Sequence, residues 1–290
     1  MSIQFSPILR PQTRGNNGTF SVTSVDLREL RDQASAVTVL DDFRVRGQPF
    51  GPHPHAGFSA VTYVFEDSEA ALRSRDSLGN DIVVGAGGIV WTQAGRGVVH
   101  EELPAQPDRE LHGLQVFVNL SSKNKLIPPQ VHYLPNSEVP EWRSDVGDRV
   151  RVVVGSFEGL ISPLAPAEPF NILDVHLRRE ITFDVQNAHH ALMYVLTGNI
   201  LVRADGREQQ VPTEHAVALH GGSGRVGIEA RGSAHLIILS GPEIRERVIA
   251  GGSFIMNEPS QIEAAIARYR RGEMGQLVPA ANLGGLPESR

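Results

Sequence analysis

The sequence predicts an all-β protein of two domains with a short helix near its C-terminus. Short runs rich in valine, isoleucine and aromatic residues recur along the chain, each bounded by glycine, proline, asparagine or aspartate, which is the pattern of strands separated by turns. The two halves are of similar size and share this rhythm, which indicates two antiparallel β domains, each a sandwich or a barrel. One helical pattern stands out, close to the C-terminal end.

The first series of strands follows from four apolar runs. None of these runs has the three-and-four spacing of a long amphipathic helix. The predicted strands are residues 60–65 (AVTYVF), 88–92 (GIVWT), 114–120 (LQVFVNL) and 150–154 (VRVVV).

The second half repeats the pattern. Asp205-Gly206 predicts a tight hairpin because glycine tolerates the positive φ that primed turns need. We expect the proline-rich residues 162–169 to form the crossover between the halves and place the domain boundary near residue 145, which gives domains 1–145 and 146–290. The predicted strands are residues 172–177, 191–196, 200–203, 216–219, 226–229 and 236–239.

The helix is predicted from its start signal and its apolar face. Ser260 and Glu263 have the S-x-x-E spacing of a capping box, in which each side chain satisfies a free backbone amide at the helix start. We expect this helix to belong to the second domain and to pack against a β domain. The apolar residues on its predicted buried stripe are Ile262, Ala265, Ile266 and Tyr269.

Composition excludes several classes of protein. The 290 residues include 27 Lys and Arg against 33 Asp and Glu, a formal net charge of −6, which argues against a broad basic face for nucleic acid. The absence of cysteine excludes disulfides, thiolate metal sites and a cysteine nucleophile. Neither a signal-peptide pattern nor a run of about 20 apolar residues is present. We therefore expect a cytoplasmic protein without a membrane segment and without direct nucleic-acid binding.

Three of the eleven histidines form a candidate metal site. His53 and His55 are separated by one residue, and on an extended chain this spacing turns both rings to the same side. Pro54 restrains the backbone between them, which lowers the entropy lost when both rings hold one ion. His100 follows after an intervening hairpin and supplies the third imidazole.

A carboxylate beside His100 completes the candidate site. On a regular strand Glu102 shares the face of His100, whereas Glu101 faces away, so Glu102 is the preferred ligand and Glu101 the alternative. Three neutral nitrogens and one carboxylate suit a single Fe(II), Mn(II), Ni(II), Cu(II) or Zn(II) ion and leave positions open for a substrate. The residues alone do not select among these metals.

Four segments of the sequence resemble motifs of the pirin family and occur in the same order. Pirins are bicupins of the cupin superfamily. The likeness covers roughly residues 40–270 and is strongest over residues 51–120, where the pirin stretches HPHRGFETVTY, TAGRGxxHxE and HGLQxWVNL have counterparts. The corresponding segments here are GPHPHAGFSAVTYVFED (51–67), VWTQAGRGVVHEELP (90–104), HGLQVFVNL (112–120) and GPEIRERVIAGGSFIMN (241–257).

The resemblance implies two stacked cupin domains, which are double-stranded β-helix or jelly-roll sandwiches, with one metal in the first. Its ligands fall on His53, His55, His100 and Glu102, and iron is the metal we expect. The resemblance also implies an activity of the quercetin 2,3-dioxygenase type, in which a flavonol is cleaved with dioxygen and Glu102 takes the hydroxyl proton. The alternative is a metal- and redox-dependent regulator that binds a transcription factor or a metabolic enzyme without turnover. A metal-binding cupin with another small substrate is the third hypothesis.

The sequence departs from the family pattern at two positions near the candidate ligands. Ser59 replaces a usual glutamate, which leaves Glu102 as the carboxylate ligand, and Ala56 replaces a common arginine beside the ligands. His112 is interpreted as a core or turn residue, with a role in orienting a metal ligand as the alternative. We interpret five histidines of the second half as structural or surface residues rather than a second metal site: His189, His190, His215, His220 and His235.

Overall fold

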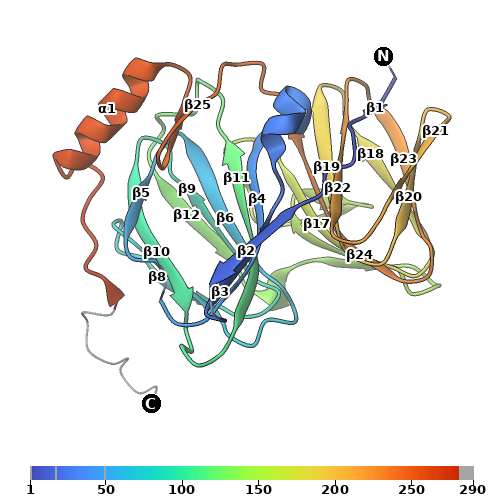
Figure 1. The fold of residues 1–290 in the computed structure, drawn as a ribbon, viewed down its shortest axis with the longest axis horizontal. Coiled ribbons are helices and arrows are strands. Elements are labelled where there is room, and N and C mark those ends of the chain that lie inside the picture. The colour runs from blue at the N-terminus through green and yellow to red at the C-terminus, as the bar shows by residue number, and fades with distance from the viewer. Residues whose placement is uncertain (1, 17, 49, 281–290) are drawn as a thin grey trace.

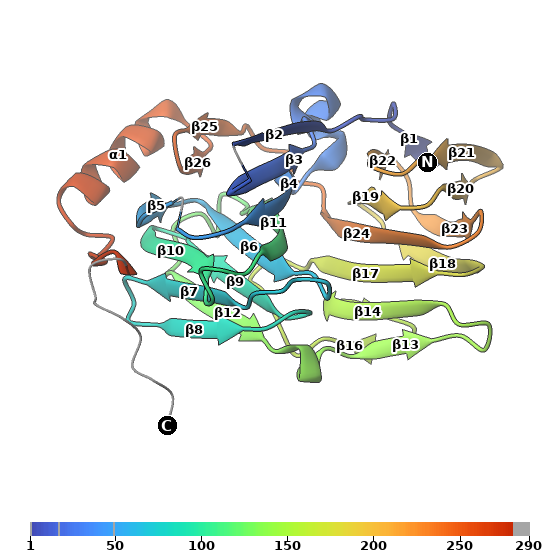
Figure 2. The same cartoon turned by 60° about the horizontal axis from the view of Figure 1, so that its bottom comes forward.

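In the computed structural model, which describes residues 2–16, 18–48 and 50–280, the chain forms two β-sandwiches that lie side by side (Figure 1, Figure 2). Every strand segment predicted above overlaps a strand, which confirms the predicted strands although their ends differ by a few residues. Asp205 (φ 49°) and Gly206 (φ 74°) form the predicted hairpin turn. No helix in the described ranges is long and apolar enough to cross a membrane.

The N-terminal sandwich has one seven-stranded and one four-stranded antiparallel sheet. Its elements are β2 (Gln12–Asn16), β3 (Phe20–Ser24), the 3-10 helix η1 (Leu27–Ala34), β4 (Val37–Val45), β5 (His53–His55), β6 (Phe58–Val64), β7 (Leu72–Asp76), β8 (Asp81–Val84), β9 (Ile89–Gln93), β10 (Val98–Pro104), β11 (Leu111–Asn119) and β12 (Gln130–Leu134). The strand orders are β12-β9-β6-β11-β4-β3-β2 and β5-β10-β7-β8.

The C-terminal sandwich repeats this arrangement of seven and four strands. Its elements are β1 (Gln4–Phe5), the 3-10 helix η2 (Asn136–Glu138), β13 (Glu141–Arg143), β14 (Arg149–Val154), the hairpin β15 (Ser156–Phe157) and β16 (Leu160–Ile161), β17 (Asn171–Leu177), β18 (Glu180–Val185), β19 (His189–Thr197), β20 (Ile200–Ala204), β21 (Arg207–Val211), β22 (His215–His220), β23 (Gly224–Ala230) and β24 (Ala234–Pro242). The strand orders are β1-β22-β19-β24-β17-β14-β13 and β18-β23-β20-β21.

The chain passes between the two sandwiches at residues 135–140, between β12 and β13. The predicted crossover at residues 162–169 is therefore wrong, because this stretch lies between β16 and β17, within the C-terminal half. The domain boundary near residue 145 stays a prediction. In the structure that position lies between β13 and β14, which pair in one sheet.

Strand alternation sorts the apolar residues into separate cores. On β6, Val61 and Tyr63 face the core between the two seven-stranded sheets, whereas Val64 faces the interior of the N-terminal sandwich. On β17, Ile172 lies in the same core between the sandwiches, and Leu173 lies inside the C-terminal sandwich. Both seven-stranded sheets are therefore covered on two faces, which explains their nearly continuous apolar runs.

Each end of the chain packs on the sandwich formed by the other half. At the N-terminus β1 pairs with β22, with Gln4 opposite His220. At the C-terminus the strands β25 (Ile249–Gly251) and β26 (Phe254–Met256) lead into helix α1 (Pro259–Arg270), which lies beside the N-terminal sandwich (Figure 1). The backbone N–H of Ile255 donates to the carbonyl of Ala56 over 3.0 Å, which ties this returning segment to the turn after β5.

Helix α1 confirms the predicted helix but not its cap. Its N-cap is Glu258, whose backbone N–H donates to the side chain of Gln261 over 3.0 Å, so the capping box starts two residues before Ser260. Ile262 and Ala265 are buried as predicted, whereas Tyr269 is 41% exposed and does not complete the buried stripe.

Candidate metal centre

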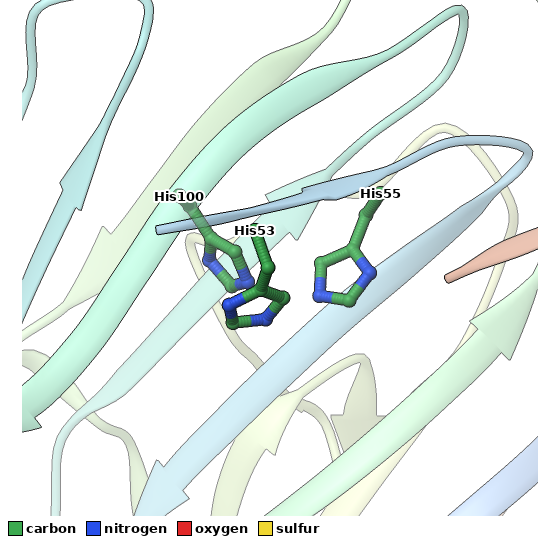
Figure 3. A group of neighbouring side chains, drawn as sticks. All are labelled: His53, His55 and His100. Carbon is green, nitrogen blue, oxygen red and sulfur yellow. The ribbon is translucent and has the colours of Figure 1, made fainter. Parts of the chain in front are cut away.

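Two neighbouring strands bring the three predicted histidines together. On β5 and β10, His53 lies opposite His100, and His55 lies opposite Val98. Because side chains alternate along both strands, the three rings project from the same face and point toward one another inside the N-terminal sandwich (Figure 3). The cluster thus forms from two residues of one short strand and one residue of its partner.

Nitrogen atoms of the three rings lie close enough together to share one metal ion. One ligand atom from each of the three histidines lies within 4.8 Å of the others. The ring nitrogen Nδ1 of His53 lies 2.9 Å from the carbonyl of Gly51, which leaves Nε2 with its lone pair when Nδ1 carries the proton. Nδ1 of His55 and both ring nitrogens of His100 are buried without a hydrogen-bond partner in the described part of the chain. Buried nitrogens without partners are costly, and a metal ion would satisfy them.

Burial keeps these imidazoles in the form that binds metals. Desolvation, followed by the neighbouring His53, lowers the pKa of His55 to about 3. Desolvation and the two other histidines also hold the pKa of His100 well below its ordinary value. His55 and His100 are therefore neutral near pH 7, and neutral imidazole is the common ligand of divalent transition metals.

Glu102 lies in the same cavity as the histidines, outside the group of three whose ligand atoms lie within 4.8 Å of one another. Burial raises the pKa of Glu102 to about 7, and hydrogen bonds from Thr62 and Ser74 oppose this rise. The hydroxyl of Thr62 donates to Oε2 of Glu102 over 2.6 Å. This bond holds the carboxylate in the cavity that the three rings face.

Glu101, the alternative ligand, has its carboxylate engaged elsewhere. Its side chain is completely buried and accepts hydrogen bonds from Arg75 and from Nε2 of Gln48, the latter over 3.1 Å. The backbone N–H of Ala280 also donates to it over 2.9 Å. These partners lie on the opposite face of β10 from His100, so Glu101 does not line the cavity.

The cavity in front of the histidines is largely apolar and aromatic. Its volume is about 530 Å³, within the range of small-molecule sites. The polar side chains on its wall are few, and besides Glu102 they include Asp41 and Gln115. Burial raises the pKa of Asp41. Its apolar wall contains Phe20, Phe43, Phe50, Phe117, Leu72 and Leu111.

Ser59 and His112, both singled out in the sequence, lie on the faces of their strands that point away from the cavity. Ser59 shares the face of Val61 and Tyr63 on β6, which is turned toward the other sandwich, so its side chain points away from the cavity. His112 on β11 contacts Asp67 over 2.6 Å and Asp42 over 3.1 Å rather than any of the three histidines.

Several residues of the site were missed by the sequence analysis. Thr62 could have been found, because it alternates with Ala60 and Val64 on the inward face of β6. Ser253 could not, because it belongs to the returning C-terminal segment and reaches the cavity through long-range packing. The backbone of Ser253 bonds to His55 and partly offsets the fall in the pKa of that ring.

The fold and the histidine cluster define a bicupin, a protein of two cupin domains, whose first domain can hold a metal ion. The chain belongs to the pirin family. The model of the family described as Pirin matches residues 12–118, and that described as Pirin C-terminal cupin domain matches residues 172–275. Human pirin is 31% identical over 278 residues, which cover 94% of this chain and 93% of that protein.

Solved structures show the same fold. A quercetin 2,3-dioxygenase from Acinetobacter baumannii superposes with a TM-score of 0.83 at 23% identity, covering 96% of this chain and 100% of that one. A bacterial pirin from Escherichia coli in complex with nickel(II) superposes with a TM-score of 0.64 at 19% identity, covering 83% and 100% of the two chains. These likenesses confirm the predicted architecture of two cupin domains followed by a helix.

Proposed function

We propose that this protein is a metal-dependent dioxygenase that cleaves a flavonol or a similar small aromatic compound. The observation that carries the proposal is the combination of three clustered histidines and one carboxylate at the wall of an apolar, phenylalanine-rich cavity. The name of the structurally similar A. baumannii enzyme supports the choice of quercetin as the first substrate to test. Iron(II) is the first metal to test, and Mn(II), Ni(II), Cu(II) and Zn(II) fit the same donors.

His53, His55, His100 and Glu102 would hold the metal. When bound, the metal supplies a Lewis acid and a template at which the substrate and dioxygen meet. The histidines contribute no negative charge, so the carboxylate of Glu102 is the one anionic group in this proposed ligand set. The low pKa of His55 keeps its imidazole ring neutral across the physiological pH range.

Glu102 also has the position of a proton acceptor. It is held in the cavity by the hydroxyl of Thr62, and a carboxylate there can take the 3-hydroxyl proton of a flavonol while remaining hydrogen-bonded. In the overall reaction one flavonol and one dioxygen molecule give one depside and one carbon monoxide; both oxygen atoms of dioxygen enter the depside, and the carbon monoxide carries C3 with its original oxygen.

The aromatic wall provides the binding energy and orientation. Phe20 and Phe50 meet edge to face with ring centroids 5.2 Å apart, and Phe117 on the same wall packs against the buried Phe58 at 4.5 Å. Such rings can stack on or contact the edge of a planar aromatic substrate. Asp41 and Gln115 can bond to hydroxyl groups on the same molecule.

The test combines metal analysis with oxygen uptake. Wild type, His55→Ala and the matched control His215→Ala are loaded with iron(II), dialysed, analysed for metal and mixed with quercetin in an oxygen electrode. We expect His55→Ala to lose about one metal equivalent and all uptake, and His215→Ala to match wild type. Detection of carbon monoxide identifies the cleavage.

Two results would contradict the proposal in different ways. If wild type and His55→Ala hold the same metal content, the metal centre is misassigned. If His55→Ala holds less metal than wild type, but iron-loaded wild type takes up no oxygen with quercetin or related flavonols, the dioxygenase proposal fails. The regulatory hypothesis would then be tested by comparing partner binding by the oxidised and reduced protein.

A further inference from the structure

A second group of metal-binding side chains lies between the two sandwiches. Asp174 and His176 occupy alternate positions on β17, and His235 lies directly opposite His176 on β24. One ligand atom from each of these three residues lies within 4.8 Å of the others. The pattern is the same as in the first site, with two alternate residues on one strand and a third on its partner.

The geometry of the group brings two imidazole nitrogens to one carboxylate. Oδ1 of Asp174 lies 2.6 Å from Nε2 of His235 and 3.4 Å from Nε2 of His176. The two rings are stacked, with centroids 3.9 Å apart and planes at 16°. Nε2 of His176 is buried and has no hydrogen-bond partner in the described ranges.

Residues of the N-terminal sandwich hold the group from the other side. The hydroxyl of Tyr63 donates to Oδ2 of the completely buried Asp174 over 2.6 Å, which orients Oδ1 toward the histidines. Oε2 of Glu66 lies 3.6 Å from Nε2 of His176. The group borders a cavity of about 420 Å³, through which solvent can reach it.

Charged side chains of both signs surround the group. The nearby carboxylates are Asp174 and four residues that line the cavity, namely Asp42, Glu66, Asp67 and Glu214. The nearby arginines are Arg44 on the cavity wall, Arg149, which bonds to Glu66, and Arg151, which lies 3.8 Å from both Glu66 and Asp174. Arg143 and Arg178 line a second cavity beside His176 and His235, so carboxylates and arginines both surround the group.

We propose that Asp174, His176 and His235 bind a second divalent transition-metal ion at the boundary of the two sandwiches. Two imidazoles and a carboxylate, with a fourth position open to the cavity, form a donor set that suits Zn(II). This site is independent of the proposed dioxygenase centre, which lies inside the N-terminal sandwich.

The experiment uses the full chain with the first site removed. His55→Ala is stripped with a chelator, equilibrated with zinc by dialysis and analysed for bound metal, and the second substitution His235→Gln is then added. Glutamine can still donate to Asp174 but is a poor zinc ligand, so the hydrogen bond is kept while the donor is lost. His215→Gln in the same background is the matched control, and circular dichroism verifies the fold of each variant.

We expect His55→Ala and its His215→Gln derivative to hold about one zinc and to gain thermal stability from it, and the His235→Gln derivative to lose both. The proposal is overturned if His55→Ala binds no zinc, or if adding His235→Gln leaves the bound zinc unchanged. If His235→Gln does not fold, His176→Gln, which alters a ring at the solvent edge, decides by the same measurement. Because the readout is metal bound in a protein without His55, failure of the dioxygenase proposal does not affect this result.

Discussion

The hydroxyl of Tyr63 donates to Asp174 across the boundary between the two sandwiches, over 2.6 Å. The preceding residue, Thr62, points the opposite way and donates to Glu102 beside the histidine cluster, also over 2.6 Å. Consecutive residues of β6 thus form one buried bond toward each of two ionisable sites. Strand β6 therefore contacts the surroundings of both sites, one from each of its two faces.

Tyr63→Phe removes the bond to Asp174 and a contact with the buried Arg151. We expect the free energy of unfolding to fall by about 1–3 kcal/mol, because a buried carboxylate loses a hydrogen-bond donor. Urea unfolding of the two proteins measures this loss. Tyr194→Phe is the control, because its hydroxyl has a longer bond of 3.3 Å to the partly exposed Asp42, and its effect should be smaller. Equal losses in the two variants would argue against a special role for Tyr63.

Thr62→Val removes the hydroxyl that holds Glu102 in the cavity. We expect metal affinity at the first site to weaken about 10-fold, because groups that orient a ligand commonly contribute this much. Competition dialysis against a chelator measures the affinity, and Thr62→Ser should restore it. Ser59→Ala is the matched control, because Ser59 is buried on the opposite face of the same strand and its hydroxyl has no partner in the described ranges. Unchanged affinity in Thr62→Val would count against Glu102 as a ligand.

Gly57→Ala should displace the returning C-terminal segment. Gly57 has a φ of +85°, and a Cβ there would lie 1.9 Å from the carbonyl oxygen of Ile255. We expect a loss of about 3 kcal/mol in the free energy of unfolding, since backbone strain and a clash with main-chain atoms act together. Gly79→Ala, at a φ of +97° with open space around it, should cost about 1 kcal/mol from strain alone. Chemical unfolding compares the two, and similar losses would contradict the predicted clash.

Asp148→Asn tests an acid-sensitive bond network in the C-terminal sandwich. Burial by itself raises the pKa of Asp148, but backbone N–H groups of Arg179 and Arg178 outweigh it, so this pKa lies below its ordinary value of 3.8. The ionised carboxylate therefore stabilises the fold above that value, and the contribution is lost as the pH falls through the folded-state pKa. We expect the variant to lose about 1–2 kcal/mol at neutral pH.

Urea unfolding of the Asp148→Asn variant at pH 7 and pH 3 measures this dependence. The difference from wild type should shrink at the lower pH, because the wild-type carboxylate begins to take up its proton there. Asp145→Asn, an exposed position in the same loop, is the control and should show no difference at either pH. A gap between wild type and Asp148→Asn that stays constant with pH would contradict the assigned cause.

The strands and the histidine cluster could be predicted because the side-chain alternation that defines them is visible within short segments of the sequence. His53 and His55 share a face on any extended chain, and the pairing of β5 with β10 places the predicted third ligand, His100, opposite His53. The same alternation could have revealed Asp174 and His176 on β17. It could also have revealed β18, whose sequence EITFDV alternates strictly between exposed and buried positions.

Other features depend on packing that no short segment encodes. The pairing of Gln4 with His220 joins a two-residue strand to the far half of the chain, and two residues carry too little pattern to predict it. The cap of α1 was misplaced because Ser260 fits the usual capping pattern, whereas the structure uses Glu258 and Gln261 with Pro259 in the first turn. The domain boundary and the ligand set remain predictions that rest on geometry and chemistry.

The return of the C-terminal segment to the N-terminal sandwich has a consequence for biosynthesis. Ser253 lines the cavity in front of the histidines, and Met274 packs with Val99 on the strand that carries His100. We expect the wall of this cavity to be completed only after residue 253 has left the ribosome, because Ser253 is the last residue along the chain that lines it. Until then we expect the three histidines to be accessible to a metal ion from the side that Ser253 covers in the finished protein.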